Sequence, residues 1–178
     1  VDAHAADPHY EPGPEGSWAI GPGQVLLLDL WGKQASPGSM YADITWCAWT
    51  GKVIPAEQQR VFDLVRDARD AGIAKAQEVA RRPVQGWEVD RATREVIDGG
   101  GYGEFFIHRT GHSIFEQDHA NGANMDDYET HDTRQLLPHT LFSIEPGIYL
   151  PGRFGFRNEI NMHVKEGEAV VSGKKQDD

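Results

Sequence analysis

Cysteine, long apolar runs and basic charge are all scarce in this sequence. Cys47 is the only cysteine in 178 residues, which excludes an internal disulfide and a thiolate zinc cluster and makes a reducing cytoplasm the expected compartment. No run approaches the roughly 20 apolar residues that cross a bilayer, so no membrane partner is expected. Lys and Arg number 17 against 28 Asp and Glu, for a formal net charge of −11. Because nucleic acids are bound mainly through clustered basic residues, no nucleic-acid partner is expected either.

The overall composition, with 39% hydrophobic and 25% charged residues, is that of one globular domain over residues 1–178. Residues 24–31 (QVLLLDLW) and 40–49 (MYADITWCAW) are short apolar runs typical of strands, and each contains a single aspartate. The segment between them, GKQASPGS, has the composition of a hairpin loop. We therefore predict two antiparallel strands that each carry one inward carboxylate.

Two helices and three further strands are predicted after this hairpin. The apolar residues of 55–82 recur at helical spacing, and Pro83 ends the pattern. A second helix is predicted over 87–98, where three consecutive glycines follow. Strands are predicted at 140–150, 156–164 and 169–171. Strands that bracket two helices indicate an α+β fold.

Four carboxylates stand out because each lies in an apolar strand: Asp29, Asp43, Glu145 and Glu159. A carboxylate buried in such a strand costs several kcal/mol unless it is paired or coordinates a cation. With the loop histidine His112, they form a set that divalent cations could neutralise. Mostly oxygen ligation with one nitrogen suits Mn²⁺, Co²⁺, Zn²⁺ or Fe²⁺, and four carboxylates favour two ions that share bridging ligands.

Several motifs then resemble those of the pita-bread metallopeptidases, the Xaa-Pro aminopeptidases and prolidases. They occur in the family's order through nearly the whole chain: DPHYEP (7–12), LLLDLWG around Asp29, YADIT around Asp43, HRTGHSI (108–114), His119, SIEPGIY (143–149) and FRNEI (156–160). The resemblance implies an α+β pita-bread fold with a curved, mostly antiparallel sheet and helices on its outer face. It also implies that the chain is the catalytic domain, incomplete at its N-terminus.

The resemblance assigns roles to individual residues. The metal ligands would be Asp29, Asp43, His112, Glu145 and Glu159, with Asp43 and Glu159 bridging two ions, Mn²⁺ first among the candidates. Glu145 would also act as general base toward a water that the two ions activate.

Four further residues would complete the site according to the same resemblance. His119 would stabilise the oxyanion, and His9 and His108 would line the pocket for the residue after the cleaved bond. Arg157 would hold the bridging carboxylate in place. The HRTGH form is typical of the proline-directed members, so the expected substrate is a peptide with proline in its second position.

Three departures from the family pattern are visible. Fourteen residues separate Asp29 from Asp43, which a hairpin insertion at 35–37 would absorb. Trp46 or Cys47 replaces a threonine, and Phe115 replaces a glycine, so both could reshape the pocket. The alternatives are a creatinase-like hydrolase that works without metal, and an inactive peptide-binding module. Retention of all five ligands speaks against both. Relatives suggest a homodimer, and association with a missing N-terminal segment is the other possibility.

Overall fold

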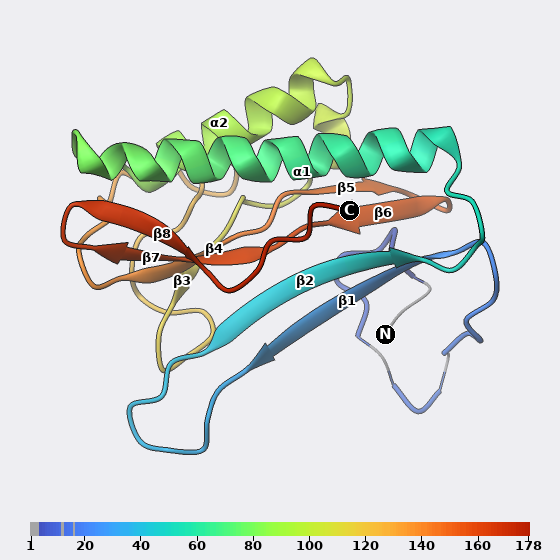
Figure 1. Ribbon diagram of the computed structural model, residues 1–178, viewed down its shortest axis with the longest axis horizontal. Helices are drawn as coiled ribbons and strands as arrows, with labels where there is room; N and C mark the ends of the chain where they lie inside the picture. The colour runs from blue at the N-terminus through green and yellow to red at the C-terminus, as the bar shows by residue number, and fades with distance from the viewer. Residues whose placement is uncertain (1–3, 12, 16) are drawn as a thin grey trace.

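The computed structural model describes residues 4–11, 13–15 and 17–178, and these form an α+β fold. Helices α1 and α2 lie together on one side of the strands (Figure 1). The elements are β1 (Val25–Gly32), β2 (Ala42–Trp49), α1 (Ala56–Ala76), η1 (Gln77–Ala80), α2 (Gly86–Gly99), η2 (Gly103–Phe105), β3 (Ser113–Ile114), β4 (Leu141–Ile144), β5 (Gly147–Leu150), β6 (Phe154–Arg157), β7 (Ile160–Lys165) and β8 (Glu168–Ser172). Every pairing among these strands is antiparallel. The described part of the chain contains no helix long and apolar enough to cross a membrane.

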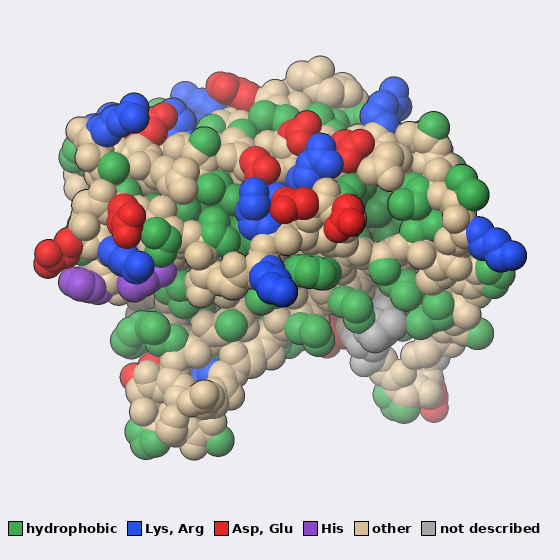
Figure 2. Space-filling view, in the orientation of Figure 1, with side chains coloured by type: hydrophobic (Ala, Val, Ile, Leu, Met, Phe, Trp, Pro, Cys, Tyr) green, Lys and Arg blue, Asp and Glu red, His purple; other side chains and the backbone are tan. Residues whose placement is uncertain are grey.

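Strands β1 and β2 form the predicted hairpin, which projects below the other strands in Figure 1. Asp29 pairs with Thr45, and Trp31 pairs with Asp43. Because side chains alternate along a strand, both aspartates and Thr45 share one face of the hairpin. The opposite face carries exposed apolar side chains. Figure 2 shows green hydrophobic side chains in this lower region, whereas acidic and basic side chains gather above it over α1.

Helix α1 follows Pro55, whose extended backbone (φ −62°, ψ 147°) ends the preceding segment. The helix was predicted to reach about residue 82, but its α-helical part ends at Ala76 and a 3₁₀ turn continues to Ala80. Helix α2 matches its predicted range closely, and the Glu88 carboxylate accepts a hydrogen bond from the Gln85 N–H at its start (2.9 Å). Both helices therefore begin close to their sequence signals, and α2 also ends at its glycines, whereas α1 changes to a 3₁₀ turn before it reaches Pro83.

The two long strands predicted over 140–150 and 156–164 are each divided in two. The ladder pairs Ile144 with Ile160 and Gly147 with Arg157, so Glu145-Pro146 lies opposite Asn158-Glu159. Proline has no N–H to contribute to a ladder, which interrupts the pairing at this point. The chain passes here from the sheet β3-β4-β7-β8 to the separate pair β5-β6. The two glutamates of the predicted site therefore lie at the junction between two sheets.

The hydrophobic core lies between the helices and the strands and has two parts. The first half of α1, including Val61 and Val65, packs in a cluster with Ile148 and Phe156 of β5 and β6. The second half, from Ile73, belongs to a cluster that contains residues of β4 and β7. Helix α1 thus spans both sheets and fixes the junction between them.

Candidate active site

Most of the predicted site residues converge on one cavity of about 630 Å³. Its lining includes the metal-ligand candidates Asp29, Asp43, His112 and Glu145, together with His9, His108, His119 and Arg157. Glu159 is only 1% exposed and is not part of this lining, but one of its carboxylate oxygens lies within 4.8 Å of ligand atoms of Asp43 and His112. The site therefore combines residues from the hairpin, from the segment before β3 and from the junction between the sheets.

His112 is positioned by the backbone around it. A Cβ atom on the preceding residue, Gly111, would lie 2.1 Å from the Ser143 carbonyl oxygen, so only glycine allows this close approach. The His112 N–H donates to Ser143 Oγ (3.0 Å). Its Nε2 atom lies 3.4 Å from Asp43 Oδ2 and 3.3 Å from Glu145 Oε1. Its Nδ1 lies 3.3 Å from the Ser113 carbonyl, which favours the tautomer with Nε2 free to coordinate.

The arrangement of Asp43, His112 and Glu159 fits a metal ion. One ligand atom from each lies within 4.8 Å of the others, and all three residues are buried. Asp43 Oδ1 and Glu159 Oε1 are buried and have no hydrogen-bond partner among the described residues. Buried carboxylate oxygens without donors are costly unless a cation satisfies them. These residues, with Glu145 beside His112, therefore fit a divalent cation that oxygen and imidazole ligands would hold.

Asp29 does not have the environment that the sequence suggested. Its side chain is 36% exposed and forms an ion pair with Arg157. The prediction that all four carboxylates are buried among apolar residues is therefore wrong for Asp29. The reason is that, among the described strands, β1 pairs only with β2, so the outer half of β1 remains open to solvent. Asp29 still lines the cavity beside the other acids.

Thr45 connects the acids of the site and was missed in the sequence. Its hydroxyl donates to Glu159 Oε2 (2.7 Å) and accepts from Arg157 Nε (2.9 Å). Arg157, predicted to hold the bridging carboxylate, thus reaches Glu159 through Thr45 and pairs directly with Asp29. Thr45 lies two residues after Asp43, so the period of two along a strand was a usable signal.

Two more supporting residues flank the site. Asn161 binds the backbone of Asp43 on both sides, accepting from its N–H (3.0 Å) and donating to its carbonyl (2.7 Å). Ser143 Oγ donates to Glu145 Oε1 (2.9 Å). Such contacts fix the orientation of the acids. Each lies two residues from a candidate ligand, Asn161 after Glu159 and Ser143 before Glu145.

Burial and mutual repulsion of the acids shift the pKa values of the site. Burial and the charges of Glu145 and Asp43 raise the pKa of Glu159 well above its usual range. Burial also raises the pKa of Glu145, although His112 and Arg157 oppose the shift. Burial disfavours protonated His112, but Asp43 and Glu145 outweigh it and raise the pKa of this histidine. An additional positive charge at the cluster would oppose the upward shifts of the two glutamate pKa values.

Three other predicted site histidines, His9, His108 and His119, line the same cavity as the acids. The His119 ring lies 4.0 Å from that of His112, and burial and His112 lower its pKa. His108 Nδ1 lies 2.7 Å from the Arg109 carbonyl, and its Nε2 lies 2.8 Å from the Tyr149 hydroxyl. Burial lowers the pKa of His108 to about 3, so it is neutral at neutral pH. His9 is exposed and lines the same cavity.

Asp118 also lines this cavity and was not singled out in the sequence. Burial and the charge of Asp43 raise its pKa to about 6. It lies in the long polar loop, where the sequence pattern does not distinguish an acid that faces the site from one that faces solvent.

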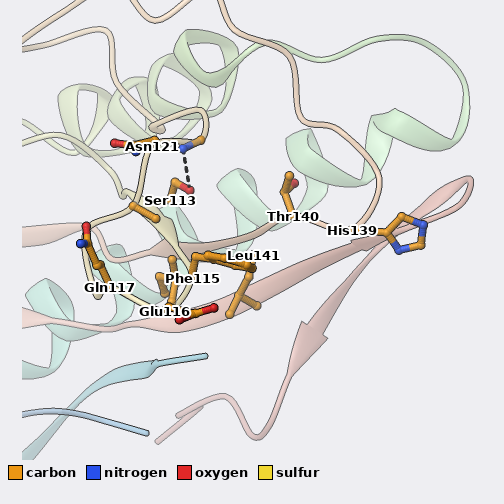
Figure 3. Close-up of a pocket in the computed structure, with 11 residues that line it drawn as sticks. Ser113, Phe115, Glu116, Gln117, Asn121, His139, Thr140 and Leu141 are labelled. Carbon is orange, nitrogen blue, oxygen red and sulfur yellow. Dashed lines mark hydrogen bonds between the residues drawn. The ribbon is translucent and has the colours of Figure 1, made fainter. Parts of the chain in front are cut away.

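Phe115 and Trp46, the departures expected to alter the pocket, do not line the cavity. Phe115 lines a second cavity of about 430 Å³ with Leu141 and Thr140 (Figure 3). Trp46 is 40% exposed on the outer face of the hairpin. Of the two candidates for the replaced threonine, only Cys47 faces inward, where its Sγ donates to the Arg157 carbonyl (3.2 Å). Neither large side chain narrows the site.

Comparison with known proteins identifies the family of this chain. The sequence model of metallopeptidase family M24 matches residues 1–166. The chain is 33% identical to an Xaa-Pro dipeptidase of Lactobacillus helveticus, over 88% of this chain and 38% of the relative. It is 32% identical to a probable dipeptidase PepE of Mycobacterium bovis, over 94% and 41%.

Solved structures give the same assignment. The crystal structure of dipeptidase PepE from Mycobacterium ulcerans is similar with a TM-score of 0.83 and 31% identity, over 98% of this chain and 43% of that one. A dipeptidase of Pyrococcus horikoshii gives 0.80 and 30%, over 98% and 45%. The chain belongs to metallopeptidase family M24, with the pita-bread fold of its prolidase-like members. It spans less than half the length of these relatives.

Proposed function

We propose that this chain is the catalytic domain of a peptidase that hydrolyses the bond before proline and uses two divalent metal ions. The observation that carries the proposal is that Asp43, His112 and Glu145 line one cavity, with a Glu159 oxygen within 4.8 Å of ligand atoms of Asp43 and His112. Two acid oxygens of this cluster have no donor among the described residues. The name Xaa-Pro dipeptidase, printed for the Lactobacillus relative, supports proline in the second position. Asp29 would complete the ligand set at the open side.

The ions, with Mn²⁺ as the first candidate, would lower the pKa of a water and polarise the scissile carbonyl. Glu145 lies beside His112 and Ser143, where it can take a proton from the attacking water and return it to the leaving nitrogen. Burial raises the pKa of Glu145, which makes its carboxylate a stronger base. The exposed His119 ring can donate a hydrogen bond to the oxyanion.

His9 and His108 would receive the proline ring. His108 is neutral and held by Tyr149, so it presents a fixed, uncharged surface to the substrate. Arg157, through Thr45 and Asp29, would keep the ligand carboxylates in orientation. We also propose a cytoplasmic location, which the reduced Cys47 suits, and association either as a homodimer or with further polypeptide over the exposed hairpin face.

Metal analysis and peptide hydrolysis test the proposal together. The purified chain should bind close to two equivalents of Mn²⁺ and hydrolyse Ala-Pro faster than Ala-Ala, and chelation should abolish both properties. Hydrolysis that persists after chelation would favour the creatinase-like alternative. Peptide binding without turnover, in a chain that holds its metal, would favour the binding module.

A further inference from the structure

We propose that Gln176 is a positioning residue for the metal site, because it holds the hairpin of β1 and β2 against the junction between the two sheets. Its side-chain amide bonds to β2, and its carbonyl bonds to the segment that carries Glu159. Figure 1 shows the segment after β8 running back to lie above β2, near β6. The inference rests on the proposed function, since the site that Gln176 would position is the proposed metal site.

The amide of Gln176 bonds to the backbone of β2 as a neighbouring strand would. The Cys47 N–H donates to Gln176 Oε1 (2.8 Å), and the Cys47 carbonyl accepts from Gln176 Nε2 (2.6 Å). Two residues opposite each other in antiparallel strands exchange the same two kinds of bond. Because β1 pairs with the other edge of β2, this amide serves the edge of β2 that faces away from β1.

Three alternate residues of β2 are joined to the rest of the fold along this edge. Asn161 makes the same pair of bonds with the backbone of Asp43 (3.0 and 2.7 Å). Between the two amides, the Thr45 carbonyl accepts from the Glu159 N–H (3.1 Å). The bonds at Cys47 are therefore the outer member of a row of three, and they fix the direction in which β2 leaves the junction.

The main chain of Gln176 is held at the junction itself. Its carbonyl accepts from Asn158 Nδ2 (3.2 Å) and from the Arg69 guanidinium of α1. Arg69 also donates to Asn158 Oδ1 (2.7 Å), and both residues are fully buried. Asn158 lies directly between Arg157 and Glu159. Gln176 is thus bonded on one side to β2 and on the other to the link between β6 and β7.

The burial of Gln176 sets it apart from its neighbours. Residues 172–175 and 177–178 are exposed, whereas Gln176 is 7% exposed. Burial of a polar side chain costs free energy unless its hydrogen bonds are made, and both ends of this amide have a partner on Cys47. The exposed segment is therefore anchored by an amide that fits one place on β2.

The placement of β2 decides how well the site can hold a metal ion. Asp43 comes from β2, whereas His112 and Glu159 come from other parts of the fold, and one ligand atom of each lies within 4.8 Å of the others. Ligand atoms must lie within about 0.2 Å of their proper distance from an ion. A small movement of β2 away from the junction therefore lowers metal affinity before it unfolds the chain.

Calorimetric titration of Mn²⁺ into the full chain tests the inference. Gln176→Met nearly keeps the size of the side chain and removes both bonds to Cys47. It should weaken Mn²⁺ binding about 10-fold, the lower end of the range for groups that orient metal ligands. If this variant does not fold in chelator, the titration is made with Gln176→Asn. Its shorter amide reaches Cys47 only if β2 moves, so binding should weaken in the same direction.

Two controls separate positioning from a loss of stability. Val164→Ala opens a cavity in the second core cluster at the far end of β7, so it should lower Tm in chelator without changing the Kd for Mn²⁺. Lys175→Met removes the ion pairs with Asp70 and Asp177 in the same segment as Gln176 and should change neither quantity. A purely structural role for Gln176 would make Gln176→Met behave like Val164→Ala.

The outcomes also separate this inference from the proposed function. An unchanged Kd for Mn²⁺ in the Gln176 variant, or an equal weakening by Val164→Ala, would overturn the role of Gln176 and leave the proposed function intact. Weaker Mn²⁺ binding by the Gln176 variant, in a chain whose wild type does not hydrolyse Ala-Pro, would support the role of Gln176 and reject the peptidase. No Mn²⁺ binding by the wild-type chain would overturn both.

Discussion

Replacement of Glu159 by glutamine should raise the thermal stability of the metal-free protein. It should also reduce the additional stabilisation that metal binding gives. Glu159 is 1% exposed, and within the described part of the chain only one of its oxygens has a hydrogen-bond donor, Thr45. The charges of Glu145 and Asp43 act on it as well as burial, and together they raise its pKa. Glutamine keeps the shape of the side chain and removes the charge.

The size of the effect follows from the unsatisfied group. A buried polar group without a partner costs about 1–3 kcal/mol, and more when it is charged. Since 1 kcal/mol shifts the Tm of a chain of this length by about 2–4 °C, Glu159→Gln should raise Tm in chelator at pH 7 by roughly 2–12 °C. Mn²⁺ at 100 times its Kd should stabilise the wild type by about 2.7 kcal/mol, and the variant by much less.

The pH dependence has a definite sign. A carboxyl group whose pKa is raised on folding stabilises the fold in its protonated form. Its contribution is therefore full below the usual value of 4.5 and is lost as the pH rises through the raised pKa of the folded protein. The metal-free wild type should lose stability as the pH rises above about 4.5, whereas Glu159→Gln should lose less.

Thermal unfolding followed by circular dichroism, in chelator and in Mn²⁺ from pH 4.5 to 8, measures both effects. Glu168→Gln is the matched control, because this strand glutamate has a side chain 58% exposed and pairs loosely with Lys165. It should leave Tm nearly unchanged. A Glu159→Gln variant that is less stable than wild type in chelator, or equally stabilised by Mn²⁺, would refute the reasoning.

Three further predictions concern other residues. Glu145→Ala should lower turnover of an active protein by orders of magnitude and His119→Ala by about 10²–10³-fold, with unchanged circular dichroism; near wild-type turnover would reject the assigned roles. Burial raises the pKa of the Cys47 thiol to about 12, so a maleimide at pH 8 should label it only after denaturation, and rapid labelling of the folded chain would contradict its burial. Leu30 and Trp46 are 68% and 40% exposed, so the chain should self-associate; Leu30→Lys should reduce the mass measured by light scattering, and a monomeric parent would disprove this.

Much of the fold was predictable because its signals are local. Alternation of apolar residues and the loop GKQASPGS placed the hairpin, and its strands begin and end within two residues of prediction. Helix α2 has an acidic residue at its start and glycine at its end, both readable from neighbouring positions. The breaks in the strands at Glu145 and Glu159 were not predicted from the sequence. An interruption of the hydrogen-bond ladder depends on which strand lies opposite as well as on Pro146.

The sequence by itself determined which side chains are the candidates for the chemistry. Burial of acids in apolar strands costs free energy unless they are paired or coordinate a cation. The ordered motifs around these acids and around the histidine after Gly111 match the family that the comparisons show. Only the tertiary structure decided how those groups meet. It placed Thr45 between Glu159 and Arg157, left Asp29 open to solvent and turned Trp46 away from the cavity. These outcomes depend on strand register and on what packs over each face, and both are set by segments far apart in the chain.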